Sequence, residues 1–367
     1  MAQSSNGIMD SVEINGYRGL ASYRLANLAN VNLIVGNNNC GKTSILEALG
    51  LLVSGGNISV ISQIGTSRSE NSLPYSSRKY GRMMDFSNIF HGHSFKLGAS
   101  FDLSANDGER SLAVSLEEFD ESTSDAYSEI HDSDESDSDL FAYVMKIVTN
   151  NKEEAITFPA REDGIVFLGR SLGLNRNRYP ATPTRFLTVD SFDPAKMGEF
   201  WNTALEDRRE AEIVEDMKIL VPSLESMHFL AGRMPSSGIL LDLASYGKRV
   251  PISTFGDGLR RLLALRLSFI GATNGLLLVD EIDTGLHWTV MQEMWKFVVE
   301  IADRNNVQVF ATTHSYDCIR GLASLIDSRP DLSSQVSLQK MTPSLKQSVC
   351  FTGEQIKIAV GQDIEVR

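Results

Sequence analysis

A run near the N-terminus, "GNNNCGKTS" (36–44), carries the strongest chemical signal in the sequence. An apolar stretch, "VNLIV" (31–35), precedes it, and "TSILEALGLLVS" (43–54) has helical spacing. Glycines in such a run let the chain curl so that backbone N–H groups point at phosphate oxygens. The Gly-x-x-x-x-Gly-Lys-Thr pattern predicts that Lys42 reaches the β- and γ-phosphates of a nucleotide and that the Thr43 hydroxyl binds Mg²⁺. The predicted phosphate-binding residues are Gly36, Asn37, Asn38, Asn39, Cys40, Gly41, Lys42, Thr43 and Ser44.

Two carboxylates end a second apolar run, "GLLLVDE" (275–281). A carboxylate at the C-terminal end of a sheet strand, beside a phosphate-binding loop, can complete the coordination shell of Mg²⁺. We assign this role to Asp280. The next carboxylate, Glu281, is placed to polarise an attacking water as a general base.

A histidine follows the third apolar run, "VQVFATTHSYD" (307–317). One helix and one return strand separate His314 from Asp280, and a right-handed crossover sets two such strands side by side. His314 is therefore predicted at the same sheet edge as Asp280 and Glu281. There it can donate a hydrogen bond to the γ-phosphate or to the attacking water.

A glycine-rich segment, "STFGDGLRRLLAL" (253–265), precedes the Asp280 strand by a single helix. Gly256, Asp257 and Gly258 open that amphipathic helix, where backbone N–H groups and the helix dipole favour an anion. Alone, the segment reads as an ordinary helix start. Its position just ahead of Asp280 favours a nucleotide-binding role.

The elements that must position these residues alternate between strand and helix, which predicts an α/β fold with a mostly parallel, helix-covered sheet. Two strands around a turn are expected within residues 12–36. β-rich and helical subdomains are expected as insertions. The predicted segments are 1–56 (core with the phosphate loop), 57–190 (inserted β-rich lobe with a mobile acidic loop, 117–139), 191–237 (helical) and 238–367 (core with the glycine-rich segment, Asp280, Glu281 and His314).

The net charge of −13 is unevenly distributed over the 367 residues. Residues 117–139 hold 11 acidic and no basic residues, and without them 36 acidic residues face 34 basic ones. This serine-rich segment is expected to be a mobile loop, and a basic nucleic-acid-binding face elsewhere is compatible with the remaining charge. Three scattered cysteines indicate reduced thiols, and neither a signal peptide nor an apolar span is found. We expect a cytoplasmic protein.

Taken in order, four features resemble an ABC-type P-loop ATPase head over about residues 11–55 and 238–320. They are the phosphate loop, the glycine-rich segment 253–265 (called the signature below), the strand that ends in Asp280 and Glu281, and His314. "YRG" (17–19), "DEIDTGLH" (280–287) and "ATTHS" (311–315) resemble the RecF and OLD-like group. Within it the sequence is most similar to stand-alone bacterial AAA family ATPases (AAA_15 and AAA_21-like), which are often found near defence genes.

That resemblance implies that two copies enclose two ATP molecules head to tail, each site being completed by the partner's signature. Gly256, Asp257 and Gly258 would then face the γ-phosphate held by the other copy's Lys42, and Arg18 would lie near the nucleotide. Phe255 stands where transporters carry a serine, and Gln63 is a candidate for the glutamine that helps bind Mg²⁺.

The expected function is a soluble ATPase that forms a dimer or higher oligomer and acts on DNA or on a separate effector such as a nuclease, in anti-phage defence. A RecF-like role in DNA repair is the alternative. A transporter motor is less favoured because the stretch 45–252, between the phosphate loop and the signature, is longer than in the more compact transporter heads. No membrane partner is expected. A self-contained nuclease is disfavoured because residues 315–367 contain no carboxylate cluster.

Three weaker signals leave alternatives open. His91 and His93 would share one face of a strand, but no further ligand lies nearby, so a metal site there is a minority interpretation. "DSDESDSD" (132–139) lacks the glycine of a calcium loop. Two interpretations stay open for a basic patch interleaved with aromatic residues: contact with nucleic-acid phosphates, or an ordinary solvated loop. The patch consists of Arg170, Arg176, Arg178, Tyr179, Arg185 and Phe186.

Overall fold

The computed structural model describes most of the chain. The described residues are 9–57, 60, 64, 68, 70, 75–77, 81–119, 141–150, 155–169, 182–188, 194–230, 238–244, 247–342 and 344–366. Within these residues no helix is long and apolar enough to cross a membrane.

A six-stranded sheet carries the predicted site residues. Its strand order is β11 (Thr184–Leu187), β15 (Leu276–Val279), β16 (Gln308–Thr312), β3 (Val31–Val35), β17 (Val336–Lys340) and β18 (Val349–Thr352). All neighbours are parallel except β17 and β18. Every residue of β3, β15 and β16 is buried, as expected of strands covered on both faces. The predicted parallel α/β fold is confirmed.

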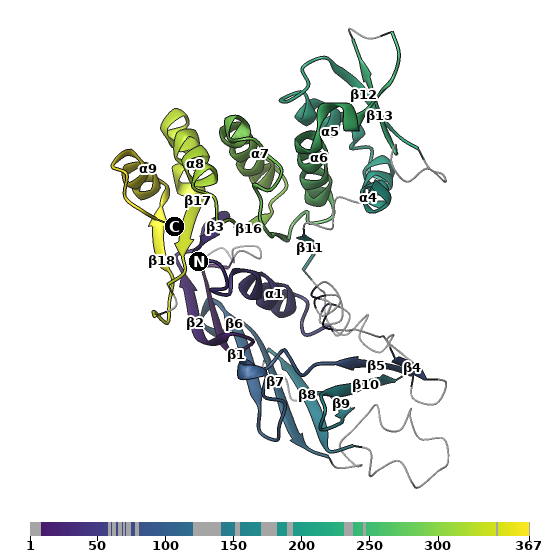
Figure 1. The fold of residues 1–367 in the computed structure, drawn as a ribbon, viewed down its shortest axis with the longest axis vertical. Helices are drawn as coiled ribbons and strands as arrows, with labels where there is room; N and C mark the ends of the chain where they lie inside the picture. Colours follow the sequence, from purple (N-terminus) through teal and green to yellow (C-terminus); the bar gives the residue numbers. More distant parts are fainter. Residues whose placement is uncertain are drawn as a thin grey trace, which may run out of the picture.

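Helices cover both faces of this sheet (Figure 1). On one face lie α6 (Asp257–Ile270), α7 (Met291–Arg304), α8 (Tyr316–Ser328) and α9 (Gly353–Gly361), and on the other lies α1 (Lys42–Val53). Side chains alternate accordingly, because successive residues of a strand point to opposite faces. Leu277 and Val279 join the core beneath α6 and α7, whereas Leu276 and Leu278 join the core around α1.

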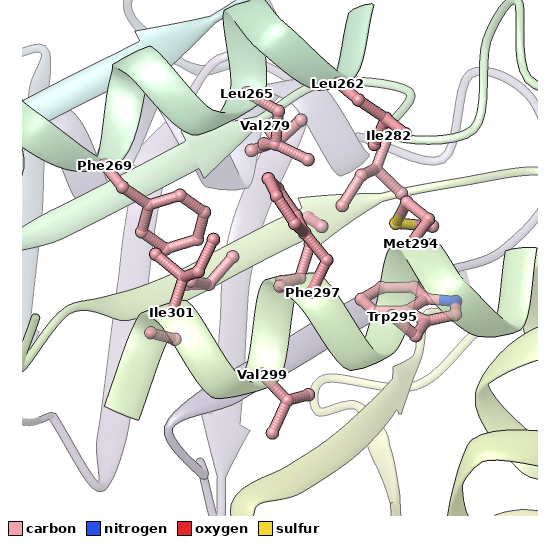
Figure 2. Close-up of a cluster of buried hydrophobic side chains, with 14 of the residues drawn as sticks. Leu262, Leu265, Phe269, Val279, Ile282, Met294, Trp295, Phe297, Val299 and Ile301 are labelled. Atoms are coloured by element: carbon pink, nitrogen blue, oxygen red, sulfur yellow. The ribbon is translucent and has the colours of Figure 1, made fainter. Parts of the chain in front are cut away.

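The packing between α6 and α7 fixes the helix that begins at the signature glycines. Fully burying a Leu, Ile or Phe side chain stabilises the fold by about 1.5–3 kcal/mol. Figure 2 shows the cluster between the two helices, to which these labelled side chains contribute: Leu262, Leu265, Phe269, Phe297 and Ile301.

A second sheet packs against the opposite side of α1, which therefore lies between two sheets. All strand pairs in it are antiparallel. The order is β2 (Leu20–Ala26), β1 (Ser11–Tyr17), β6 (Ser100–Ala105), β7 (Arg110–Glu118), β8 (Tyr143–Thr149), β9 (Ile156–Ala160), β10 (Ile165–Gly169), β5 (Gly81–Asp85) and β4 (Tyr75–Ser77).

The N-terminal region contains three strands, so the prediction of two was wrong. β1 and β2 form a hairpin in the nine-stranded sheet, and only β3 enters the parallel sheet. The burial patterns explain this division. β1 and β2 alternate between buried and partly exposed residues, as in a sheet with one core face, whereas β3 is buried throughout.

The region beyond β11 contains two helices and a small sheet. The stretch expected to be helical forms α4 (Pro194–Glu206) and α5 (Glu210–Met217), separated at Arg208, whose φ is +56°. β12 (Leu224–Phe229), β13 (Ile239–Leu243) and β14 (Val250–Pro251) form an antiparallel sheet. Short 3₁₀ turns are η1 (His91–His93), η2 (Asn106–Gly108), η7 (Ile252–Phe255), η8 (Trp288–Val290) and η9 (Pro330–Gln335).

The division into four segments stays a prediction. Two sheets cross its boundaries: β11, from the segment 57–190, pairs with β15, and β12 pairs with β13 across residue 237.

A buried arginine ties α5 to α6. The side chain of Arg266 is 0% exposed, and its Nε donates to Asp216 at 2.5 Å. Burial lowers the pKa of Arg266, with the charge of Asp216 working in the opposite direction. Arg304 also contacts Asp216, at 2.7 Å, but is 47% exposed. The pairing of Arg266 and Asp216 therefore connects the helical region to the core through a desolvated contact.

Replacing this arginine is expected to destabilise the fold. Breaking a buried ion pair from one side lowers the free energy of unfolding by about 3–5 kcal/mol. For Arg266→Met we expect a loss of about 3 kcal/mol, because Arg304 still contacts Asp216. The control is Arg304→Met, an exposed position worth less than about 1 kcal/mol. Urea unfolding of both variants measures the difference, and equal losses would contradict the assignment.

Candidate nucleotide-binding site

The phosphate loop links β3 to α1. Gly36 is required by close packing, because a Cβ there would lie 2.9 Å from Met341 O, and Gly41 has a φ of +100°. Asn39 also has a positive φ, +64°. Lys42 opens α1, and its Nζ donates to Gly36 O at 2.8 Å and to Asn37 O at 2.9 Å. The loop is thus curled around the helix N-terminus, where backbone N–H groups favour an anion.

One cavity of about 510 Å³ brings together most of the predicted site residues. Of the predicted residues, it is lined by Arg18, Asn38, Asn39, Cys40, Gly41, Lys42, Thr43, Ser44, Asp280, Glu281 and His314. Gly36 and Asn37 contribute through their carbonyl oxygens, which accept from Lys42.

Asp280 is held by two threonine hydroxyls. Thr43 Oγ1 donates to the carboxylate at 3.1 and 3.3 Å, and Thr312 Oγ1 donates to Oδ1 at 2.6 Å. The first contact joins α1 to the end of β15, and the second joins β15 to β16. A hydroxyl and a carboxylate facing each other are the oxygen ligands that Mg²⁺ prefers, so the predicted pair fits this ion.

Glu281 sits on a sharp turn just beyond β15. Its φ of +50° is uncommon for a residue with a side chain. Two contacts hold the turn: Glu281 N donates to Thr312 Oγ1 at 2.9 Å, and Arg261 donates to Glu281 O at 2.6 Å. Burial lowers the pKa of Arg261, although nearby carboxylates, that of Asp283 first, work against it. The strained turn directs the backbone so that Glu281 lines the cavity.

The Glu281 side chain has two neighbours at the cavity. Thr284 Oγ1 donates to Oε2 at 3.1 Å, and His314 Nδ1 lies 3.6 Å from Oε1. The predicted pairing of the two strands is confirmed, because β15 and β16 are parallel neighbours. The same strand ends therefore bring Asp280, Glu281 and His314 together.

The signature lies away from this cavity. Gly256, Asp257 and Gly258 open α6, and none of them lines the cavity of their own chain. Asp257 is 85% exposed, and Phe255 beside it is 39% exposed.

Four residues that line the cavity were not predicted as nucleotide-site residues. Thr312 orients Asp280 and Glu281, and its only signal is its place in "ATTHS". Arg68 and Glu70 also line the cavity, and nothing in the sequence marked them. His93 lines it too, although the sequence marked this residue only as a weak candidate for a metal site.

Among the weaker candidates, the structure corrects the prediction for the "HGH" histidines, and several other candidate residues lie outside the described part of the chain. The histidines of "HGH" form a 3₁₀ turn instead of a strand, because Gly92 adopts a φ of +70°, and each ring contacts a different partner: His91 contacts Arg18 O and His93 contacts Asn88. Within the described part of the chain no group of three metal-ligating side chains occurs. Arg185 lies over the Phe200 ring at 5.2 Å. Glu117 and Glu118, predicted to begin the mobile acidic loop, instead end β7 and pair with β8. Outside the described residues lie Gln63, residues 120–139, Arg170, Arg176, Arg178 and Tyr179.

Comparison with known families matches residues 31–317 to the family described as "AAA domain, putative AbiEii toxin, Type IV TA system". The match runs from β3 to just beyond His314. The chain belongs to this family of AAA-type P-loop ATPases. This agrees with the resemblance drawn from the sequence motifs.

Two curated relatives match over short stretches. An "ATP/GTP phosphatase" of Helicobacter pylori is 34% identical over 94 residues, 25% of each chain. "Uncharacterized protein MJECL10" of Methanocaldococcus jannaschii is 43% identical over 47 residues, 13% of this chain and 22% of the relative. The chain thus spans about a quarter of the length of the curated relatives it matches.

Among solved structures, a crystal structure of an SMC head bound to the C-winged helix domain of ScpA is similar in fold. It matches with a TM-score of 0.50 and 13% identity, covering 94% of this chain and 97% of the other. This similarity shows that the AAA-domain chain and the SMC head share a fold.

Proposed function

We propose that the chain binds ATP with Mg²⁺ and hydrolyses it to ADP and phosphate. The observation that carries this proposal is the single cavity lined by the phosphate loop, Asp280, Glu281 and His314. Family membership and the similarity to an ATP/GTP phosphatase support the same chemistry.

Binding uses the residues at the start of α1. Lys42, which donates to two loop carbonyls in this structure, turns its ammonium group to the β- and γ-phosphates. Thr43 and Asp280 hold Mg²⁺, which neutralises charge on the phosphates when it is bound. The loop N–H groups and the helix dipole stabilise the remaining negative charge.

Hydrolysis uses the turn after β15. Glu281 accepts a proton from water as the water oxygen attacks the γ-phosphorus and the bond to the β–γ bridging oxygen breaks. His314, beside Glu281 at 3.6 Å, donates a hydrogen bond to the γ-phosphate. Thr284 and the strained turn keep the Glu281 carboxylate oriented toward the cavity.

A second copy of the chain completes each site. Gly256, Asp257 and Gly258 form a helix N-terminus suited to an anion, but they do not line the cavity of their own chain. Head-to-tail pairing brings the signature of one copy onto the γ-phosphate in the other. ATP then closes the pair, and hydrolysis releases it.

The cycle of ATP binding and hydrolysis is coupled to action on DNA or on a separate effector such as a nuclease, in anti-phage defence. The family description, "AAA domain, putative AbiEii toxin, Type IV TA system", and the sequence resemblance to ATPases found near defence genes favour a defence role. RecF-like DNA repair is the second candidate, supported by the "YRG" and "ATTHS" segments.

The test is molar mass by light scattering, with and without ATP·Mg²⁺ and then with duplex DNA. The Glu281→Gln variant is used so that ATP persists during the measurement. An ATP-dependent doubling of mass is expected. DNA retained by the dimer would favour the repair role, and indifference to DNA would favour a protein effector. A variant that stays monomeric with ATP would rule out the composite site.

A further inference from the structure

The wall of the nucleotide cavity contains a cluster of two arginines and two glutamates, Arg18, Arg68, Glu47 and Glu70. Arg18 is in the turn between β1 and β2, with a φ of +50°, and is only 4% exposed. Glu47 lies one turn into α1. Arg18, Arg68 and Glu70 line the cavity, whereas Glu47 lies behind them. The cluster joins the hairpin, α1 and the segment after α1 at one point.

Glu70 occupies the planar end of the Arg18 guanidinium. Nη1 donates to Oε1 at 2.8 Å and Nη2 donates to Oε2 at 2.9 Å. This bidentate geometry is the one that an arginine also offers to a phosphate group. As long as Glu70 keeps this position, the two outer nitrogens of Arg18 are engaged by a carboxylate inside the cavity.

Glu47 is the fixed member of the cluster. Its carboxylate is 1% exposed, contacts Arg18 Nε at 2.8 Å and also pairs with Arg68. Burial raises the pKa of Glu47, and the two arginines act in the opposite direction. It sits on a helix whose residues 44–53 are all buried, so it cannot leave without disrupting α1. Glu70, at 20% exposed, faces the cavity and is the carboxylate that can move.

The charge balance of the cluster makes the difference between the fixed Glu47 and the movable Glu70 important. Two positive and two negative side chains give a cluster with no net charge, so an incoming phosphate gains little attraction from Arg18 while both carboxylates remain. If Glu70 moves away, the cluster gains one positive charge beside the phosphate loop. The two outer nitrogens of Arg18, Nη1 and Nη2 (the Arg18 fork), then have the geometry and the charge to bind two oxygens of one phosphate group.

We propose that Glu70 is an internal competitor of the nucleotide: it occupies the Arg18 fork and yields it to phosphate when ATP binds in the same cavity. The proposal rests on the nucleotide-binding function proposed above. Glu47 has the complementary role of a positioning residue, which keeps Arg18 and Arg68 on the cavity wall during the exchange. Nucleotide affinity is thereby set partly by a carboxylate outside the phosphate-loop motif.

The test is isothermal titration of ATP·Mg²⁺ and of inorganic tripolyphosphate into wild type and Glu70→Gln. The variant removes the competing charge and should bind both ligands about tenfold more tightly, the effect of one charge-assisted hydrogen-bonded contact. In an Arg18→Ala background, Glu70→Gln should have no effect. The matched control is Glu13→Gln, which breaks an Arg24–Glu13 pair of equal length, 2.8 Å, on the same hairpin outside the cavity.

Each outcome decides one question. If wild type binds ATP but Glu70→Gln binds it equally or more weakly, the competitor role is overturned. The same holds if tightening persists without Arg18, because the effect would then be general repulsion between Glu70 and phosphate. If wild type binds neither ligand, the proposed nucleotide function itself fails. Glu70→Ala, measured alongside with its melting temperature, provides a second variant should glutamine disturb folding.

Discussion

Replacing Glu281 by glutamine is expected to lower the rate of ATP hydrolysis about 100-fold or more, the usual contribution of a general base. Glutamine keeps the size of the side chain and can still contact Thr284, but it cannot take a proton from water. The backbone contacts that hold the turn, to Thr312 and Arg261, are unaffected by this change. ATP affinity should therefore stay within about twofold of wild type.

Steady-state phosphate release and ATP titration measure the two quantities separately. Glu300→Gln is the matched control, because Glu300 is 44% exposed and pairs with a basic residue, as Glu281 does at 41% exposed. It lies on α7, and its loss should leave the rate unchanged. A Glu281→Gln variant that hydrolyses ATP at the wild-type rate would show that another group activates the water.

The Lys42→Ala variant is expected to lose ATP binding, with an affinity at least about 100-fold lower. The ammonium group would contribute charge-assisted hydrogen bonds to two phosphates, each worth about 1.5–3 kcal/mol, and about 1.4 kcal/mol corresponds to a factor of ten. Alanine also leaves Gly36 O and Asn37 O without the donor that they have here. The helix itself should persist, because alanine favours helices.

Titration of ATP·Mg²⁺ together with a thermal melt separates lost binding from lost folding. Lys146→Ala is the control, because Lys146 is a partly exposed lysine on β8, paired with Glu117 away from the cavity. Unchanged ATP affinity in the Lys42→Ala variant, with a normal melt, would contradict the phosphate-loop assignment.

The parts of the site that follow regular motifs could be predicted from the sequence. Parallel strands that end in polar residues must place those residues at one sheet edge, so Asp280 and His314 could be located from two apolar runs and one crossover. The phosphate loop was equally clear, because its spacing and glycines follow from the geometry of the turn.

Other parts depend on tertiary packing and leave no pattern in the chain. Arg68 and Glu70 reach the cavity from a stretch without periodicity, and Glu47 looks like any charged residue in a helix until its burial is known. The sheet that β1 and β2 join could not be inferred either, because alternation indicates one buried face without identifying the partner strand.

The enclosure of α1 between two sheets has a consequence for the energetics of ligand binding. Residues 44–53 are buried, so the backbone amides of this helix should exchange hydrogen only through large-scale opening of the structure. The helix that carries Lys42 and Thr43 is thus ordered before any ligand arrives. Nucleotide binding then has little chain entropy to lose at this helix, and more of the interaction energy remains as affinity.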